Sequence, residues 1–477
     1  MRRSDSKTHP SLRDTLARGV VCGLLALLPV ATVYAQDSAP IRPTPMFSRW
    51  QEDWSALADP SLRNRPGDAL KYIPLAADDP SSYLSLGLNL RERVEYNDAV
   101  GFGVDANRSD SYLIQRLQVH SDLHFNSHWQ LFTQLEDARD YGKQVTTSAD
   151  RNPVDLRLAF VAYNTTIGDD TFKFRAGRQE FAFDLQRFVS LRDGPNVRQA
   201  FDAIWAGWET RSWHVIGFIS QPVQYRDAQD FDDYSDPHLR FNMVRAEHLL
   251  FGTQELSAYY ALYSRDNARY VDASGRESRH IFDVRYAGAA HGLDWDLETM
   301  IQRGSVGASD IRAWAIGTRA GYTFAATSWQ PRLGLQLDAA SGDRHGADHT
   351  VGTFNPLFPN GYYLTLAGYT GYVNFIHVKP SVTVKPVSRL TLTAAFALQW
   401  RQTTADAVYT QPNIPIPGTA GHGGRWTGSY GQLRGDYAIN TNLVAALEMV
   451  HFAIGDALRR AGAHNSNYLG MELKYLW

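Results

Sequence analysis

Arginine dominates the basic residues of this 477-residue chain. Of its 47 Lys and Arg residues only seven are Lys, so forty are Arg. A guanidinium presents a planar fork of N–H donors that can grip a carboxylate or a phosphate through two hydrogen bonds, and it is less strongly hydrated than an ammonium. The same groups could instead pair with the 50 Asp and Glu residues and brace the structure. The arginines therefore indicate either a route for anions or a set of internal salt bridges.

Basic residues recur at alternate positions in several segments. In residues 83–96, four leucines and Val94 share one parity, whereas Arg91, Arg93 and Glu95 share the other. Side chains on a β-strand alternate between its faces, so the segment predicts a strand with one apolar and one charged face. An Arg or Lys facing lipid near the midplane would cost roughly 2–4 kcal/mol, so the charged face should point inward. The same parity predicts these interior basic residues: Arg91, Arg93, Arg116, Arg157, Lys173, Arg175, Arg401 and Arg434.

The sequence lacks the motifs of common enzyme sites. It contains no Gly-x-Ser-x-Gly elbow, no His-Glu-x-x-His zinc site and no phosphate-binding Gly-Lys-Ser/Thr loop. Its histidines are spread about one to a strand, which suits wall residues better than a catalytic base. Cys22, the only cysteine, lies in the predicted leader. We therefore expect no enzymatic activity and no cofactor. A structural or adhesive barrel with a plugged lumen is the other alternative to a channel.

The elements that would position the charges are short strands. Eighteen alternating or β-rich runs are joined by connections that are alternately short and long. With both termini on the side of the short connections, this gives nine long and eight short connections. That pattern is typical of an all-β fold, an antiparallel transmembrane β-barrel of 18 strands with short periplasmic turns and long extracellular loops. A barrel of this size leaves an aqueous channel. The predicted strands are 83–96, 111–125, 129–139, 154–163, 171–183, 199–209, 213–221, 241–250, 254–264, 279–289, 293–302, 311–324, 329–340, 372–385, 390–401, 429–438, 443–452 and 467–477.

The two ends of the chain support export to the outer membrane. Residues 1–36 carry a basic leader, an apolar run and an A-x-A-like site, as in a cleaved signal peptide. Residues 37–82 then form a periplasmic lead-in, and residues 83–477 the barrel. In the last strand, Leu469, Met471, Leu473, Tyr475 and Trp477 share one face, which we expect to meet lipid.

Charge excludes one class of partner. Removing residues 1–36 takes away five basic and two acidic residues, so the formal charge changes from −3 to −6. A nucleic-acid-binding protein needs a basic surface for phosphates, so no nucleic-acid partner is expected. Two acidic loops, Asp338–Asp348 and the aspartates 230, 232, 233 and 236, could hold calcium through oxygen ligands, although their spacing is not that of a known calcium loop.

Several segments resemble the alginate export family of outer-membrane barrels. The most specific is Arg-Asp-Gly-Pro-Asn-Val-Arg at 192–198, and the others are 49–54, 70–75, 84–96, 177–180 and 352–362. The resemblance implies an 18-stranded barrel with a narrow electropositive pore. Where the motif is present, it points to Arg91 and Arg93 in the first strand and to Arg192 and Arg198 in the loop after the fifth.

The expected function is an outer-membrane channel that passes an anionic polysaccharide or another anionic solute through an arginine-lined pore. The alternative is a general or substrate-specific diffusion porin for small solutes unrelated to alginate. The expected partners are outer-membrane lipid and lipopolysaccharide, the barrel assembly machinery and periplasmic polysaccharide export proteins.

Overall fold

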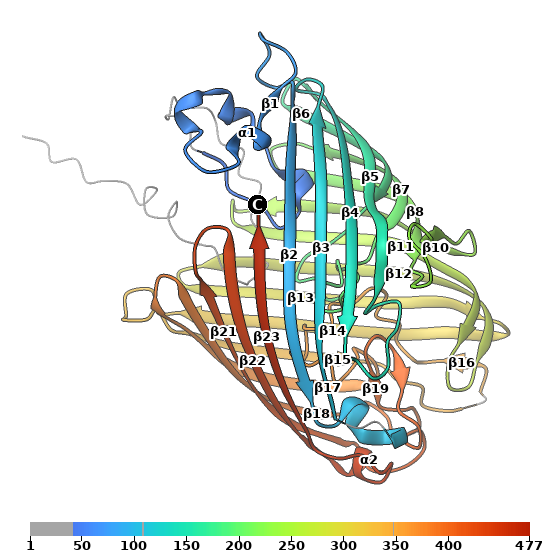
Figure 1. Ribbon diagram of the computed structural model, residues 1–477. Coiled ribbons are helices and arrows are strands. Elements are labelled where there is room, and N and C mark those ends of the chain that lie inside the picture. The colour runs from blue at the N-terminus through green and yellow to red at the C-terminus, as the bar shows by residue number, and fades with distance from the viewer. Residues whose placement is uncertain (1–41, 107–108, 347) are drawn as a thin grey trace, which may run out of the picture.

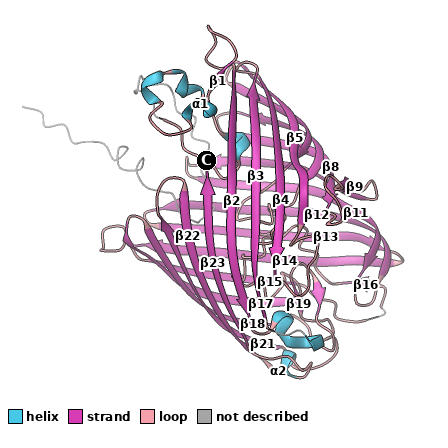
Figure 2. Ribbon diagram, viewed as in Figure 1, coloured by secondary structure: helices cyan, strands magenta, loops and turns pink. Residues whose placement is uncertain are grey.

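Eighteen antiparallel strands form a closed barrel in the computed structural model, which describes residues 42–477 except residues 107–108 and 347 (Figures 1 and 2). The predicted signal peptide lies outside the described residues. The barrel strands are β2 (Tyr83–Asn97), β3 (Asp110–His124), β4 (Trp129–Tyr141), β5 (Asn152–Ile167), β6 (Asp170–Gln179), β7 (Phe201–Glu209), β8 (Trp213–Gln224), β10 (Leu239–Leu250), β11 (Gln254–Arg269), β12 (Ser274–Ala290), β13 (Leu293–Val306), β14 (Ser309–Thr323), β15 (Arg332–Ala340), β17 (Phe375–Val387), β18 (Leu390–Trp400), β21 (Trp426–Ala438), β22 (Leu443–Ile454) and β23 (Ser466–Leu476). The predicted fold class and strand number are confirmed.

The remaining elements are short. They are the two-residue strands β1 (Ile73–Pro74), β9 (Tyr234–Ser235), β16 (Thr350–Val351), β19 (Tyr409–Thr410) and β20 (Ile414–Pro415), the helices α1 (Asp68–Lys71) and α2 (Asp456–Arg459), and the 3-10 helices at Arg49–Gln51, Ser55–Ala58, Pro60–Leu62 and Val100–Ala106. Among the described residues, no helix is long and apolar enough to cross a membrane.

The barrel closes where β23 pairs with β2, in register from Asn89 with Leu476 to Asn97 with Tyr468. Side-chain exposure follows the predicted parity. Val94 and Met471 are 45% and 50% exposed on the outer face, whereas Arg93 on the inner face is 0% exposed. Alternation on β2 and β23 thus turns an apolar face to lipid and a polar face to the lumen. On β7, β8 and β10 the inward residues are apolar instead, and Phe201, Phe218 and Phe241 belong to the largest buried core.

The two ends of the barrel differ. Eight short turns and the C-terminus lie at one end, which we call the turn end, and nine connections lie at the other, the loop end (Figure 1). Two of these nine, 270–273 and 307–308, are as tight as the turns at the other end. Here β11 to β14 continue beyond the predicted boundaries, and Gly307 adopts the positive φ of 57° that a two-residue turn requires. The pattern of long outer connections therefore holds for seven of the nine.

Trp477 departs from the predicted lipid face. Its ring lies where a Cβ on Gly67 would sit, and the Lys71 ammonium is 4.6 Å from the ring centroid. Its backbone carbonyl accepts a hydrogen bond of 3.0 Å from the buried Arg49. The last residue therefore packs against the segment before the barrel, because this segment folds back over the turn end and covers it.

Candidate pore constriction

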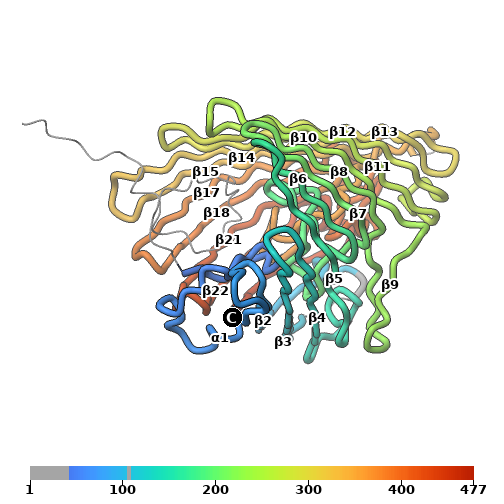
Figure 3. The backbone as a smooth tube through the Cα atoms, turned by 90° about the horizontal axis from the view of Figure 1, so that it is seen from above, coloured from blue at the N-terminus to red at the C-terminus, as the bar shows by residue number. Residues whose placement is uncertain are grey.

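The lumen is crossed by the connection between β6 and β7, residues 180–200, which we call the inner loop. Near its start, Asp184 accepts hydrogen bonds of 2.6 and 2.8 Å from Arg245 of β10. Near its end, Asp193 accepts a 2.5 Å hydrogen bond from Arg116 of β3. In sheet order β10 lies across the barrel from β2 and β3, and Figure 3 shows them on opposite sides. The inner loop therefore spans the lumen from wall to wall.

A second connection, residues 341–374, lies along the inner loop, and we call it the capping loop. Its Phe358 carbonyl accepts a hydrogen bond of 3.0 Å from the Ser190 amide, and the Phe358 amide donates one of 2.9 Å to the Phe188 carbonyl. The Asn360 amide donates to the Gln186 carbonyl over 3.2 Å. These bonds satisfy backbone groups that would otherwise be buried without partners. The two loops consequently form one body inside the barrel.

The inner loop holds three side-chain-bearing residues in the left-handed region. The φ angles are 56° for Asp184, 54° for Gln186 and 52° for Arg192. Such conformations are costly for residues other than Gly and persist only where the surroundings enforce them. The salt bridges at both ends and the bonds to the capping loop supply that enforcement.

Four basic side chains surround Asp193, and we call them with Asp193 the Asp193 cluster. Its carboxylate lies 2.5 Å from the guanidinium of Arg116, 2.7 Å from that of Arg198, 3.3 Å from the ammonium of Lys474 and 4.0 Å from Arg91. Burial raises the pKa of Asp193, but the four cations outweigh burial and hold it well below its usual range. One loop carboxylate therefore serves as counter-ion to four cations from β2, β3, β23 and its own loop.

Glu472 is the second acid beside this cluster. It lies 3.2 Å from Arg91 and 2.9 Å from Lys474. Two carboxylates thus face four cations, so the cluster keeps a net positive charge. Asp193 is also the more accessible of the two, with 16% of its side chain exposed against 5% for Glu472.

Arg93 is the most deeply paired of the predicted arginines. It forms ion pairs with Glu95 at 2.5 Å, Glu448 at 2.6 Å and Glu472 at 3.3 Å, and its side chain is 0% exposed. Its guanidinium also lies 5.1 Å from the ring centroid of Tyr362 in the capping loop. Arg93 therefore braces the wall and supports the capping loop, and its complete burial keeps it from contact with a solute.

The other predicted residues on the wall are also engaged. Arg157 lies 3.4 Å from Glu180 and donates 2.8 Å to the Gln199 carbonyl. Arg175 stacks between Trp50 and Trp205, with its guanidinium carbon 4.2 and 4.4 Å from their ring centroids.

Three predicted residues lie apart from the Asp193 cluster. Lys173 pairs with Glu209 at 2.7 Å near the turn end. Arg434 pairs with Asp436 at 2.7 Å and with Glu448. Arg401 donates only to backbone carbonyls of the connection after β18, so it organises that connection rather than facing a solute.

Arg192 directly precedes Asp193 in the inner loop and is half-buried. Among the described residues, no carboxylate lies within 4.0 Å of its guanidinium. Arg175 and Arg401 also have no acid partner, but Arg175 stacks on two tryptophans and Arg401 donates to backbone carbonyls. Of the ten predicted positions, Arg91, Arg93, Arg116 and Arg198 therefore converge on one region of the lumen, where Asp193 and Glu472 link them.

Sequence reasoning missed the loop residues Asp193 and Arg187. Asp193 is in the family-like motif, but its role depends on where a loop folds, which parity cannot give. Arg187 was missed for the same reason. It is buried against Glu298, with Asp296 at 3.3 Å and the Tyr363 hydroxyl at 2.7 Å. The short Arg-Asp-Gly motif was the available signal for Asp193.

Two aspartates of one predicted calcium-binding loop lie close to a third aspartate from β5. Carboxylate oxygens of Asp155, Asp232 and Asp233 lie within 4.8 Å of one another. Burial, and the nearby Asp155, raise the pKa of Asp233 to about 6, although hydrogen bonds to it oppose the shift. The Asn152 amide and backbone N–H groups already occupy several of these oxygens. In the other predicted loop, Asp338 is in β15 and accepts hydrogen bonds from Gln336 and Tyr363.

The fold matches channels of known structure. OccAB1 of Acinetobacter baumannii superposes with a TM-score of 0.55 at 13% identity, covering 86% of this chain and 99% of that one. OccK2 (OpdF) of Pseudomonas aeruginosa, solved in complex with glucuronate, gives 0.55 at 11% identity, covering 82% and 97%. OccK5 (OpdH) of the same organism gives 0.50 at 11%, covering 82% and 97%. At these identities the likeness establishes the fold. No curated protein matches the sequence.

The sequence itself matches the alginate export family over residues 82–472, nearly the whole barrel. Family and fold together establish an outer-membrane channel of the porin type. The chain is a member of the alginate export family.

Proposed function

We propose that this channel passes solutes that carry carboxylates, and that Asp193 occupies the place a solute carboxylate takes during passage. The observation that carries the proposal is the Asp193 cluster: one accessible carboxylate held by four basic side chains in the lumen. A uronate carboxylate has the same charge and the same fork geometry toward Arg as Asp193 has.

Exchange of one carboxylate for another costs little because the cations keep a partner throughout. If Asp193 left without a replacement, four cations would face each other with only Glu472 between them, which is unfavourable. An incoming anion removes that repulsion, and Arg192, the residue before Asp193 in the chain, provides a cation that is not already paired with an acid of the described residues. The cluster therefore supports stepwise transfer of anions rather than trapping of one.

Two comparisons are consistent with this chemistry. The family is that of alginate export, and alginate is a polyuronate. A channel of the same fold was solved with glucuronate bound. A channel for small uncharged solutes would not require a cationic cluster.

The test is single-channel recording in planar bilayers with Asp193→Asn. The Coulomb attraction between the loop and the cluster is removed, so anion preference should rise several-fold and uronate oligosaccharides should block at lower concentration. Asp294→Asn is the matched control, because it removes an inward carboxylate that pairs with Arg332 away from the cluster.

Unchanged uronate block in Asp193→Asn, or an equal effect of Asp294→Asn, would refute the exchange role. Cation preference in the wild-type protein would refute the anionic cargo and favour a general diffusion porin.

A further inference from the structure

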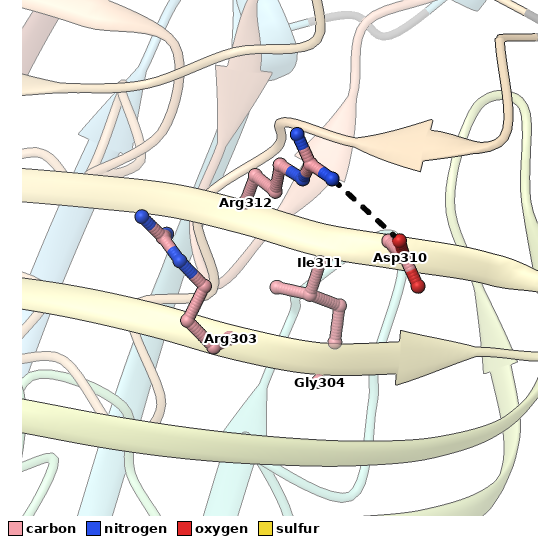
Figure 4. Close-up of a pocket in the computed structure, with 5 residues that line it drawn as sticks. All are labelled: Arg303, Gly304, Asp310, Ile311 and Arg312. Carbon is pink, nitrogen blue, oxygen red and sulfur yellow. Dashed lines mark ion pairs between the residues drawn. The ribbon is translucent and has the colours of Figure 1, made fainter.

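Two arginines face outward at the loop end of the barrel. Arg303 of β13 and Arg312 of β14 are direct partners in the antiparallel register. Their neighbours in the chain, Gln302 and Ile311, are buried on the inner side, so parity turns both arginines to the outer face. Together with Gly304, Asp310 and Ile311 they line a surface hollow (Figure 4).

The pair lies immediately beyond the apolar band of the outer face. Toward the turn end, the outward residues of β13 include Leu293, Leu297 and Ile301, which are 43–45% exposed. On β14, Trp314 follows Arg312 on the same face and pairs with Ile301. An aromatic residue at the edge of the apolar band marks the membrane interface. The two arginines are one step further out, at the level of the outer-leaflet head groups.

Few acidic groups lie near Arg303 and Arg312. Arg303 donates only to the Gln302 carbonyl, at 3.0 Å, and no carboxylate of the described residues lies within 4.0 Å of it. Arg312 lies 3.8 Å from Asp310, and both side chains are about two-thirds exposed, at 66% and 69%. Like charges directly opposite each other on a sheet repel. A single acid at that distance does not compensate two guanidinium groups.

We propose that Arg303 and Arg312 bind the phosphate of an outer-leaflet lipid head group. Directly opposed side chains on a sheet have Cβ atoms about 4.5–5.5 Å apart, so both guanidinium groups can reach one phosphate. Each can donate two hydrogen bonds to phosphate oxygens, and the bound dianion removes the repulsion between them. The connection that joins β13 to β14 beyond the pair is the two-residue turn 307–308, and the capping loop lies beside it, where β16 pairs with β14 at Asp310 and Ile311.

The experiment measures lipid binding to the intact, delipidated barrel. Native mass spectrometry follows titration with bis-phosphorylated lipid A and with the same lipid after removal of its phosphates. The variant is Arg303→Ala with Arg312→Ala. The matched control is Arg211→Ala with Arg389→Ala, which removes two exposed arginines from turns at the opposite end.

The wild-type protein and the control should prefer the phosphorylated lipid, and the variant should bind it about tenfold more weakly. Anion selectivity should stay the same in all three, because the pair lies outside the lumen. Equal binding of phosphorylated lipid by variant and wild type would overturn the proposal. So would full displacement of the lipid by an equal concentration of inorganic phosphate, which would assign the pair to free anions.

Heat-modifiable migration reports folding of each protein. If the double variant does not fold, Arg303→Gln alone decides the question, with a several-fold loss expected and no loss contradicting it.

Discussion

The two ends of the inner loop are anchored in opposite ways. At the Asp184 end, Arg245 and Arg285 are almost fully buried, and they are shared by four acids: Asp184, Glu247, Glu255 and Asp296. At the Asp193 end, four cations share two acids, and the loop carboxylate is the more accessible. The first end has more acid than base, and its loop carboxylate, Asp184, is only 3% exposed, so this end fixes the loop. The second end has spare positive charge, and its loop carboxylate, Asp193, is 16% exposed, so Asp193 can be exchanged.

The largest expected effect comes from removing each loop carboxylate in turn. Asp184→Ala leaves Arg245 and Arg285 buried with fewer partners, and losing one member of a buried ion pair costs about 3–5 kcal/mol of unfolding free energy. Asp193→Ala should cost less than Asp184→Ala, because the Asp193 carboxylate is 16% exposed against 3% for Asp184, so solvent anions can take its place. Urea unfolding of the detergent-solubilised barrel, followed by tryptophan fluorescence, measures both. Equal losses would contradict the contrast between anchor and exchange site.

A smaller effect is expected on uronate block, and it should differ between arginines on the two sides of the lumen. Arg192 and Arg319 are both half-buried lumen arginines, and neither has a carboxylate partner within 4.0 Å among the described residues. Arg192→Gln should weaken uronate block several-fold, and the difference from wild type should shrink as salt shortens the Debye length.

Arg319→Gln is the matched control, since it lies on β14, away from the Asp193 cluster. Its uronate block should change little. A larger effect of Arg319→Gln would place the anion route on the side of the lumen away from the Asp193 cluster.

The smallest expected effect concerns the segment that reaches the Asp193 end from outside. Phe47 lies under Arg198, 4.3 Å from its guanidinium carbon, and Lys71 holds the same segment by donating 2.8 Å to the Leu86 carbonyl. Burial, and then the charge of Arg49, lower the pKa of Lys71 to about 7. When residues 42–75 are docked on the barrel, Lys71 is neutral above about pH 7, whereas in the undocked segment it stays protonated up to about pH 10.5. The docked state therefore binds fewer protons than the undocked state between these two values.

Docking should accordingly strengthen as the pH rises from 7 toward 10, and hydrogen exchange of residues 42–75 reports it. Lys71→Met should abolish this pH dependence. Docking that weakens over the same range would contradict the lowered pKa.

The wall was predictable from sequence, whereas the constriction was not. Strand parity depends only on the period of two along the chain, so the alternation of apolar and charged residues is enough to place Arg91, Arg93 and Arg116 on the inner face. Whether each one binds a solute depends on acids brought in by loops, such as Asp193, or across strands, such as Glu448. In the structure most of these arginines have internal partners. Among the described residues, Arg175, Arg192 and Arg401 lie within 4.0 Å of no acid, and of these Arg175 stacks on tryptophans and Arg401 donates to backbone carbonyls. The Asp193 cluster has spare charge.

Trp477 shows the same limit on the outer face. Parity placed its side chain toward lipid, and its backbone still exchanges hydrogen bonds of 2.7 and 2.9 Å with Leu88. Contacts with Gly67 and Lys71 of the segment before the barrel, which strand parity does not include, decide the position of its ring.

The backbone bonds between residues 186–190 and 358–360 have an evolutionary consequence. Because two connections share one short ladder, an insertion in either would shift its partner's register and displace Asp193 or Tyr362. Lineages that change cargo should therefore alter the lengths of both loops together, while the other outer connections drift independently.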